Sequence, residues 1–144
     1  MALSPYLQEQ IAARLRLALG LIETVKVYSS SSEYDIRNSL SRLYYAFFHA
    51  SLALLMATEA DIVAVSKSHG MVHARIQRRF GKTMSITRTI RELYDLRRQS
   101  DYEADMFASR YSGNIEQARK EAVLLLKRAK TDFYWLYYEA RKSL

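Results

Sequence analysis

Residues 38–57 read NSLSRLYYAFFHASLALLMA, a helix-forming stretch that is apolar on nearly all of its sides. At 100° per residue, its two opposite faces carry Ala46, His49, Ala53 and Met56 on one side and Tyr44, Phe48 and Leu55 on the other. A helix of this kind has to be covered on two sides. In a small bundle the second cover is often another subunit, so we expect a homodimer. The alternative is that the rest of the same chain covers both faces.

The rest of the chain also has the spacing of helices, with apolar residues recurring every three or four positions. We expect helices at about Pro5–Tyr28, from an N-cap at Ser32 to about Thr58, at about Ser68–Phe80, from about Ile86, and over roughly 30 residues after an N-cap at Asn114. No segment has the alternation of a strand. The sequence therefore predicts an all-α protein with a single domain, 1–144.

The composition narrows the class of protein further. The chain has 144 residues, one proline, four glycines and no cysteine, which excludes a disulfide framework, a thiolate metal site and a cysteine nucleophile. The first ten residues, MALSPYLQEQ, lack the pattern of a signal peptide, and no stretch approaches 18 uncharged apolar residues. We therefore expect a cytoplasmic protein with no membrane association.

The net charge of +7 is concentrated in one segment. From Lys67 to Arg98 there are nine basic residues against two acidic ones, and the remainder of the chain is neutral. This segment could present a positive face to an anionic partner, with RNA as the leading candidate. The residues expected to bind nucleic acid are Arg75, Arg78, Arg79, Lys82, Arg88, Arg91 and Arg98. The alternative is a solvated basic face that only aids solubility.

Residues 88–105, RTIRELYDLRRQSDYEAD, place a charged pair where an amphipathic helix ordinarily carries leucine. Arg97 and Asp101 fall on the same stripe as Ile90 and Leu93, so both are expected to face inward. Burying a guanidinium and a carboxylate costs several kcal/mol unless they satisfy each other or a partner. They therefore either lock the core or form a site, with Tyr102 on the flank of the same helix.

The three histidines offer few signs of metal or nucleophilic chemistry. His69 and His73 share a helix face but have no companion ligands, so no metal site and no cofactor are expected. His49 lies in an aromatic helix, where it is either a core histidine or a proton-transfer group beside Arg42. Arg42 itself is either part of this site or an ion-pair partner of a carboxylate such as Asp101. The isolated glycines form no phosphate-binding loop.

Three blocks of the chain resemble the small HEPN-domain proteins of the UPF0332 type. They are SRLYYAFFHASLALL (41–55), SHGMVHARIQRRF (68–80) and LYDLRRQSDYEAD (93–105), in the order found in that family. The resemblance implies an up-and-down four-helix bundle with a further short helix, usually dimeric. It also implies a toxin-like protein paired with a nucleotidyltransferase antitoxin, and in several members a metal-independent ribonuclease.

The chain departs from the ribonuclease pattern at one position. The family carries an arginine and then, after four to six residues, a histidine, whereas here Arg97 is followed by Tyr102 at the four-residue spacing. Tyrosine, with a pKa near 10, replaces imidazole poorly as a general base. On this hypothesis Arg97 stabilises the phosphate, His49 transfers the proton and Asp101 orients one of them. The alternatives are a non-catalytic binding or scaffold module, and a Tyr102 that accepts a nucleotide from the partner transferase.

Overall fold

The structure is a computed structural model, and it describes residues 2–26, 32–59, 61–62, 68–81, 85–102 and 114–144. Within these ranges every regular element is a helix, which confirms the prediction of an all-α protein. The elements are α1 (Pro5–Glu23), α2 (Glu33–Thr58), α3 (His69–Phe80), α4 (Ile86–Tyr102) and α6 (Ile115–Arg141).

Short polar side chains begin four of these helices. The side chains of Ser4, Ser32, Ser68 and Asn114 each accept a hydrogen bond from the backbone N–H three residues later, at 3.1–3.2 Å. Each cap satisfies one of the donors that a helix N-terminus leaves without an intrahelical partner. The predicted caps at Ser32 and Asn114 are thus confirmed.

The end of α1 differs from the sequence prediction, which extended this helix to about Tyr28. The helix ends at Glu23, and the Thr24 hydroxyl donates to the carbonyl of Leu21 at 2.8 Å. The Thr24 N–H bonds to the same carbonyl at 3.1 Å, so the last turn tightens and stops. Apolar spacing at Val25 had suggested a longer helix, but β-branched Thr24 and Val25 are weak helix formers.

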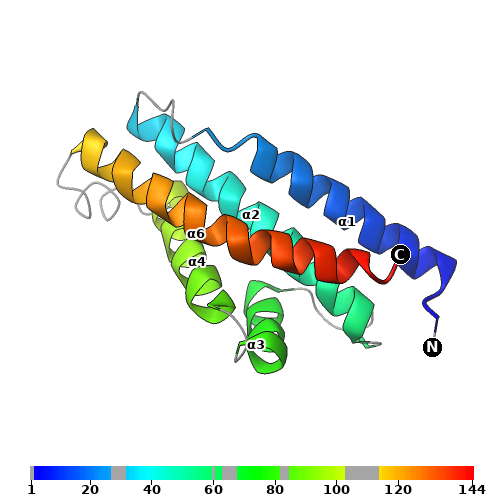
Figure 1. The fold of residues 1–144 in the computed structure, drawn as a ribbon. Helices are drawn as coiled ribbons and strands as arrows, with labels where there is room; N and C mark the ends of the chain where they lie inside the picture. The colour runs from blue at the N-terminus through cyan, green and yellow to red at the C-terminus, as the bar shows by residue number, and fades with distance from the viewer. Residues whose placement is uncertain (1, 27–31, 60, 63–67, 82–84, 103–113) are drawn as a thin grey trace.

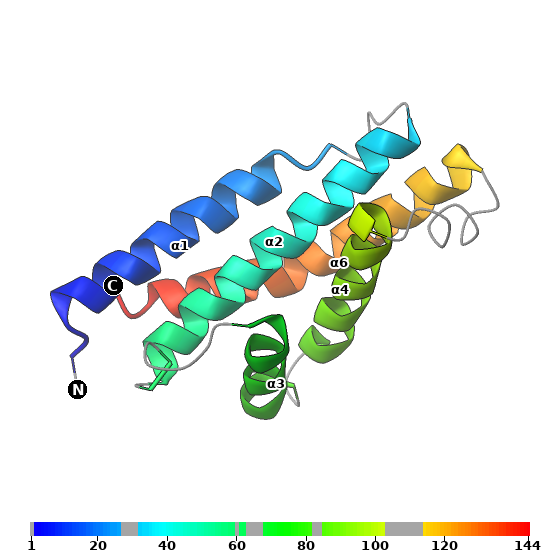
Figure 2. The ribbon, with the colours of Figure 1, turned by 180° about the vertical axis from the view of Figure 1, so that it is seen from behind.

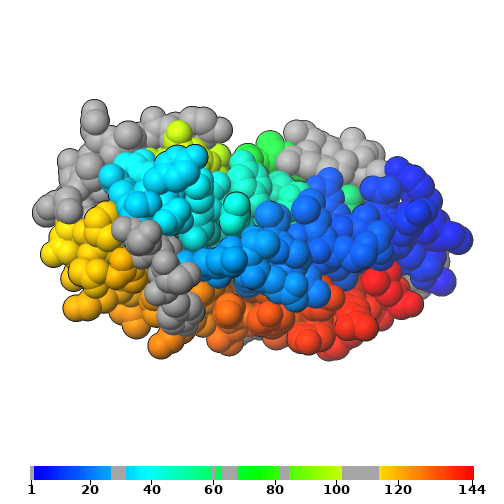
Figure 3. Space-filling model, turned by 90° about the horizontal axis from the view of Figure 1, so that it is seen from above, coloured from blue at the N-terminus to red at the C-terminus, as the bar shows by residue number. Residues whose placement is uncertain are grey.

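The helices are arranged around α2. It packs against α1, α3, α4 and α6, and it runs opposite to α1 and α4 and in the same direction as α6 (Figures 1 and 2). Seen from above, α1 lies along α6, and the beginnings of α2 and α6 are at the same end of the molecule (Figure 3). The short α3 lies against α2 and the beginning of α4, so α2, α3 and α4 meet in one region.

Both apolar faces of α2 are covered within this one chain. Fifteen of its 26 residues are buried, including Ala46 and Ala53 on one face and Tyr44 and Leu55 on the other. The cover that suggested a second subunit is therefore supplied by the chain itself, and the homodimer stays a prediction.

Among the described helices, α2 also passes a test of length and apolarity for a membrane span. Its most apolar 18-residue window has a mean hydropathy of 1.2, and 72% of that window is buried inside the molecule. Core helices pass the same test, so this observation alone does not indicate a membrane protein.

Candidate functional site

Arg97 lies inside the molecule, among the rings of three tyrosines. Its residue surface is 6% exposed, and its guanidinium carbon is 5.3 Å from the ring centres of Tyr44 and Tyr94 and 5.8 Å from that of Tyr45. Its Nη1 also donates a long hydrogen bond, 3.5 Å, to the Tyr45 hydroxyl. Aromatic ring faces attract a cation, most strongly away from water. The prediction that Arg97 faces inward is confirmed.

Asp101 does not share this burial, and the prediction that it faces the core is wrong. Its side chain is 29% exposed and lies 3.8 Å from the Arg97 guanidinium, at the outer limit of an ion pair. It also accepts a hydrogen bond from the Ser41 hydroxyl at 3.2 Å. The stripe on α4 leaves the core one turn after Arg97, so the carboxylate reaches solvent at the edge of the tyrosine rings.

Two histidines of α3 meet the same region through Tyr44, which is completely buried. The Tyr44 hydroxyl lies 2.5 Å from His69 Nδ1 and 2.9 Å from His73 Nε2. Phe48 packs on His69 with ring centres 4.8 Å apart, and Tyr94 lies edge-on to His73 at 5.2 Å. We call this group the Arg97 cluster; its members are Arg97, Tyr44, Tyr45, Tyr94, His69 and His73.

The environment sets the protonation of these groups. Burial, with smaller contributions from His69 and Arg97, lowers the pKa of His73 to about 4. Burial and then the Arg97 charge also lower the pKa of His69, while burial raises the pKa of Tyr44 well above its ordinary value. At neutral pH the imidazoles of His69 and His73 are therefore neutral, the Tyr44 phenol is protonated, and Arg97 carries the positive charge.

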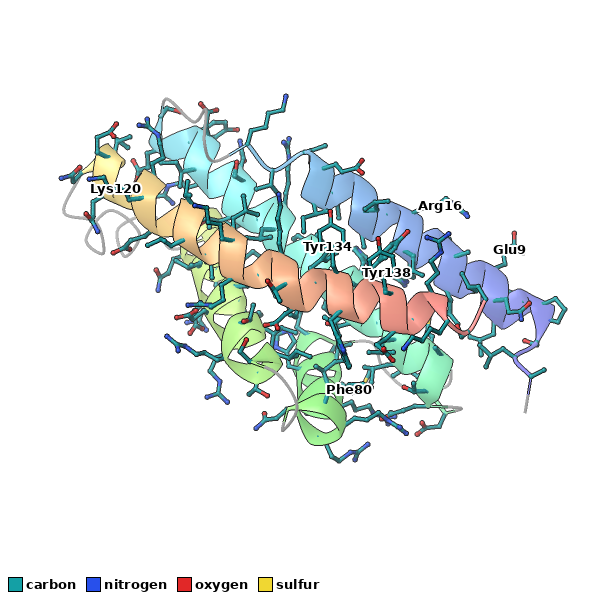
Figure 4. The ribbon with its side chains drawn as sticks, in the orientation of Figure 1. Glu9, Arg16, Phe80, Lys120, Tyr134 and Tyr138 are labelled. Carbon is teal, nitrogen blue, oxygen red and sulfur yellow. The ribbon has the colours of Figure 1, made fainter. Side chains whose placement is uncertain are left out.

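A contact at the far end of α3 helps to fix the two histidines in place. Phe80 packs edge-on against Trp135 of α6, with ring centres 5.5 Å apart (Figure 4). Val72, between the two histidines, and Ile76, between His73 and Phe80, are completely buried. The apolar side of α3 therefore holds the histidine side towards Tyr44.

His49 lies at the edge of the Arg97 cluster, with its ring centre 6.5 Å from that of Tyr45, and it also contacts α1. Arg14 Nη1 donates to His49 Nδ1 at 3.0 Å, which leaves the proton of the neutral imidazole on Nε2. Burial and then the Arg14 charge lower the pKa of His49 to about 4. Arg42 is exposed and donates to the carbonyl of Thr24 at 3.4 Å. The expected grouping of His49 with Arg42, Arg97 and Asp101 therefore stays a prediction.

The arginines of α3 belong to an ion-pair network. Glu59, only 9% exposed, lies 2.6 Å from Arg75, 3.4 Å from Arg79 and 3.6 Å from Arg78, and Asp61 pairs with Arg75 at 2.9 Å. The charge count for residues 67–98 does not include Glu59 and Asp61, because both residues precede that segment in the sequence. Arg75 is thus mostly buried in this network, whereas the side chains of Arg78 and Arg79 pair with Glu59 and remain 72% and 44% exposed.

The arginines of α4 other than Arg97 face solvent. Arg88, Arg91 and Arg98 are exposed, and the first two line a cavity of about 450 Å³ at the beginning of the helix. Lys82 lies outside the described residues, as does the side chain of Tyr102, although the backbone of Tyr102 ends α4. Of the described residues predicted to bind nucleic acid, all except Arg75 are therefore exposed, on both α3 and α4.

A buried carboxylate that the sequence did not single out holds the start of α4. Asp132 of α6 is 2% exposed and accepts hydrogen bonds from the hydroxyls of Ser85, at 2.9 Å, and Thr89, at 2.8 Å. Its position at a helix N-terminus also suits a negative charge. This contact fixes α4 against α6, and so contributes to the placement of Arg97.

In the described part of the chain, no group of three or more His, Cys, Asp or Glu side chains is arranged to hold a metal ion. The chain matches no protein-family model, and it has no significant match among curated proteins or solved structures.

Proposed function

We propose that this chain is a HEPN-type domain, an up-and-down four-helix bundle with one short additional helix, and the toxin-like half of a pair that acts on RNA in the cytoplasm. Two features support this fold. The long helices α1, α2, α4 and α6 alternate in direction, with α3 inserted between α2 and α4 (Figures 1 and 2). The described parts of the three blocks that resemble the family lie on α2, α3 and α4, which contact one another.

The observation that carries the functional proposal is the Arg97 cluster, in which a cation and two neutral imidazoles converge. Cleavage of RNA without a metal needs positive charge for the phosphate and a base for the ribose 2′-hydroxyl. Arg97 supplies the charge. His69 replaces His49 as the proton-transfer candidate, because Tyr44 joins it to the arginine's surroundings while His49 is held by Arg14.

The basic face then has the task of holding the RNA backbone. Arg88, Arg91 and Arg98 lie on the same helix as Arg97, and phosphate contacts of this kind carry most of the affinity for RNA. The Glu59 network leaves α3 a lesser share. Arg88→Glu is therefore expected to weaken RNA binding and its salt dependence more than Arg75→Gln does, as fluorescence anisotropy with a single-stranded RNA will measure.

The central test is cleavage of single-stranded RNA in EDTA. Arg97→Lys keeps a cation among the rings but loses the planar guanidinium, and His69→Gln removes the imidazole. Both are expected to lower the cleavage rate by about a hundredfold or more. His49→Gln is the matched control and should retain the wild-type rate. Wild-type activity in both Arg97→Lys and His69→Gln would contradict the assignment.

A second candidate function follows from the packing of Arg97. Its three-ring enclosure and its loose pairing with Asp101 suit a core cation in a non-catalytic binding or scaffold module. This function predicts that RNA binds through α4 but is never cut, and that Arg97→Ala weakens folding without changing the affinity of the folded protein for RNA.

The partner proposals rest on the family resemblance. Co-expression with the nucleotidyltransferase of a neighbouring gene should yield a complex on gel filtration and a nucleotide adduct on Tyr102 by mass spectrometry. An unmodified Tyr102 peptide would remove the acceptor role. Sedimentation at tens of micromolar tests the homodimer, and a monomer alone would reject it.

A further inference from the structure

We propose that Tyr44 joins His69 and His73 into one proton-sharing unit, in which His69 takes the proton from the substrate hydroxyl and His73 stores it. The substrate, a ribonucleotide 2′-hydroxyl, rests on the proposed function. The unit itself rests on the contacts among these three side chains.

Counting protons limits how the three groups can bond. A phenol carries one hydroxyl proton and a neutral imidazole one N–H, while two imidazole nitrogens lie 2.5 and 2.9 Å from the Tyr44 oxygen. Tyr44 therefore donates to one histidine and accepts from the other. In either direction His69 and His73 carry their protons on like-named nitrogens, both on Nδ1 or both on Nε2.

Only one of the two directions leaves His69 able to act as a base. When Tyr44 donates to His73 Nε2 and accepts from His69 Nδ1–H, the lone pair of His69 Nε2 is available. His69 is also less buried than His73, and Tyr44 has no exposed surface. A substrate would therefore meet His69 first, with Tyr44 and His73 behind it.

The step consists of three proton transfers, whose net result is that one proton leaves the 2′-hydroxyl and one is gained by His73. No group is oxidised or reduced. The 2′-hydroxyl proton passes to His69 Nε2, the His69 Nδ1 proton to the Tyr44 oxygen, and the Tyr44 proton to His73 Nε2. His73 becomes imidazolium while His69 and Tyr44 end neutral. The 2′-oxygen keeps the electron pair of the broken O–H bond and attacks phosphorus, and the departing 5′-oxygen leaves with its own pair and takes a proton from solvent.

The surroundings fit a unit that stays neutral until a substrate arrives. The groups facing it are Tyr45 from α2 and Tyr94 and Arg97 from α4. The Arg97 cation opposes a second positive charge on His73, and a bound phosphodiester beside Arg97 offsets it. Proton storage on His73 is therefore favoured only with an anion in place.

Nitrogen-15 NMR of the imidazoles in the full chain tests the unit without any assay of activity. In the wild type, His69 and His73 are both expected to be protonated on Nδ1, and Tyr44→Phe, which removes the hydroxyl that selects these tautomers, should change the spectra of both. His49, protonated on Nε2 by its bond from Arg14, is the internal reference. Protons on unlike-named nitrogens in the wild type, or identical spectra in Tyr44→Phe, would overturn the proposal.

Cleavage kinetics test the role of the unit in the reaction. Tyr44→Phe is expected to slow cleavage about tenfold to a hundredfold and to shift its pH profile while RNA affinity is retained. Tyr34→Phe, an exposed tyrosine on the same helix, should change nothing. His73→Gln keeps a polar side chain but cannot store a proton, so it should be equally slow, and it serves if Tyr44→Phe fails to fold. Full rates in a folded variant overturn the relay, whereas a wild type that cuts no RNA overturns only the proposed function.

Discussion

Two sides of α2 each bring an arginine close to histidine, in different ways. Towards α1, Arg14 donates directly to His49 at 3.0 Å. Towards α3 and α4, the Arg97 guanidinium lies 5.3–5.8 Å from the ring centres of three tyrosines, one of which, Tyr44, bonds to His69 and His73. In the first pair, the histidine nitrogen accepts the hydrogen bond that the arginine donates. In the second, aromatic faces hold the cation, and the imidazole nitrogens are left to bond to Tyr44.

The difference shows how one residue pairing can serve two purposes. An imidazole that accepts from arginine has one nitrogen occupied and one tautomer selected, which suits a fixed contact between helices. Imidazoles separated from the arginine by rings remain neutral yet keep proton exchange open through a hydroxyl. The histidines on the Arg97 side can therefore take part in proton transfer, whereas His49 on the Arg14 side makes a fixed contact between two helices.

The largest expected effect comes from removing the Arg97 side chain from among the tyrosine rings. Arg97→Ala removes a buried stem and a desolvated cation–ring interaction, and we expect the free energy of unfolding to fall by about 2–4 kcal/mol. Urea denaturation measures it. Arg98→Ala, at the next and exposed position, should change stability by less than about 0.5 kcal/mol. Equal stability of the two variants would show that the rings do not hold Arg97.

Acid should weaken both sides of α2. His49 and His73 have folded-state pKa values of about 4, below the unfolded value of about 6.5, so the unfolded chain binds more protons between these limits. Their contribution is complete above pH 6.5 and is lost as the pH falls towards 4. From pH 7 to 4.5 we expect a loss of about 2–3 kcal/mol, after allowance for partial solvent screening.

Urea denaturation at a series of pH values measures this loss. His49→Gln should remove about half of the slope between pH 6.5 and 4.5 and leave the His73 part, which separates the two sides of α2. A slope unchanged in His49→Gln would mean that the Arg14 side does not titrate as described.

Removing the cation on the α1 side should raise the pKa of His49. In Arg14→Leu the value should climb from about 4 but stay below 6.5, because burial is the larger cause and remains. The pKa values of His69 and His73 should not move, since Arg97 is their cation. Arg16→Ala is the matched control, because Arg16 points away from the bundle on the same helix (Figure 4). An NMR titration of the histidines measures these pKa values, and an unchanged pKa of His49 would contradict the Arg14 contact.

The smallest effect is expected from Asp101→Asn. The carboxylate is partly exposed and 3.8 Å from Arg97, so its loss should cost less than about 0.5 kcal/mol. A cost similar to that of Arg97→Ala would restore the buried Arg–Asp pair that the sequence suggested. Thermal melting at two salt concentrations measures the effect and shows whether it is electrostatic.

Particular residues show how far sequence reasoning reached. The period of α2 predicted that both of its faces are covered, and Ser32 and Asn114 predicted two helix starts, because burial patterns and caps depend on residues a few positions apart. Arg97 was singled out by the same logic. Local spacing does not reach the partners of Arg97 that lie on other helices, which are Tyr44 and Tyr45 of α2, although Tyr94 lies on α4 itself.

The sequence by itself determined the all-helical class, two of the caps and the inward position of Arg97, since each follows from periodicity along one helix. Only the tertiary structure decided which histidines stand near that arginine, that Asp101 reaches solvent and that Glu59 holds the arginines of α3. Those outcomes depend on the rotation and offset of helices against one another. They are set by side-chain packing between segments far apart in the chain, which no local pattern records.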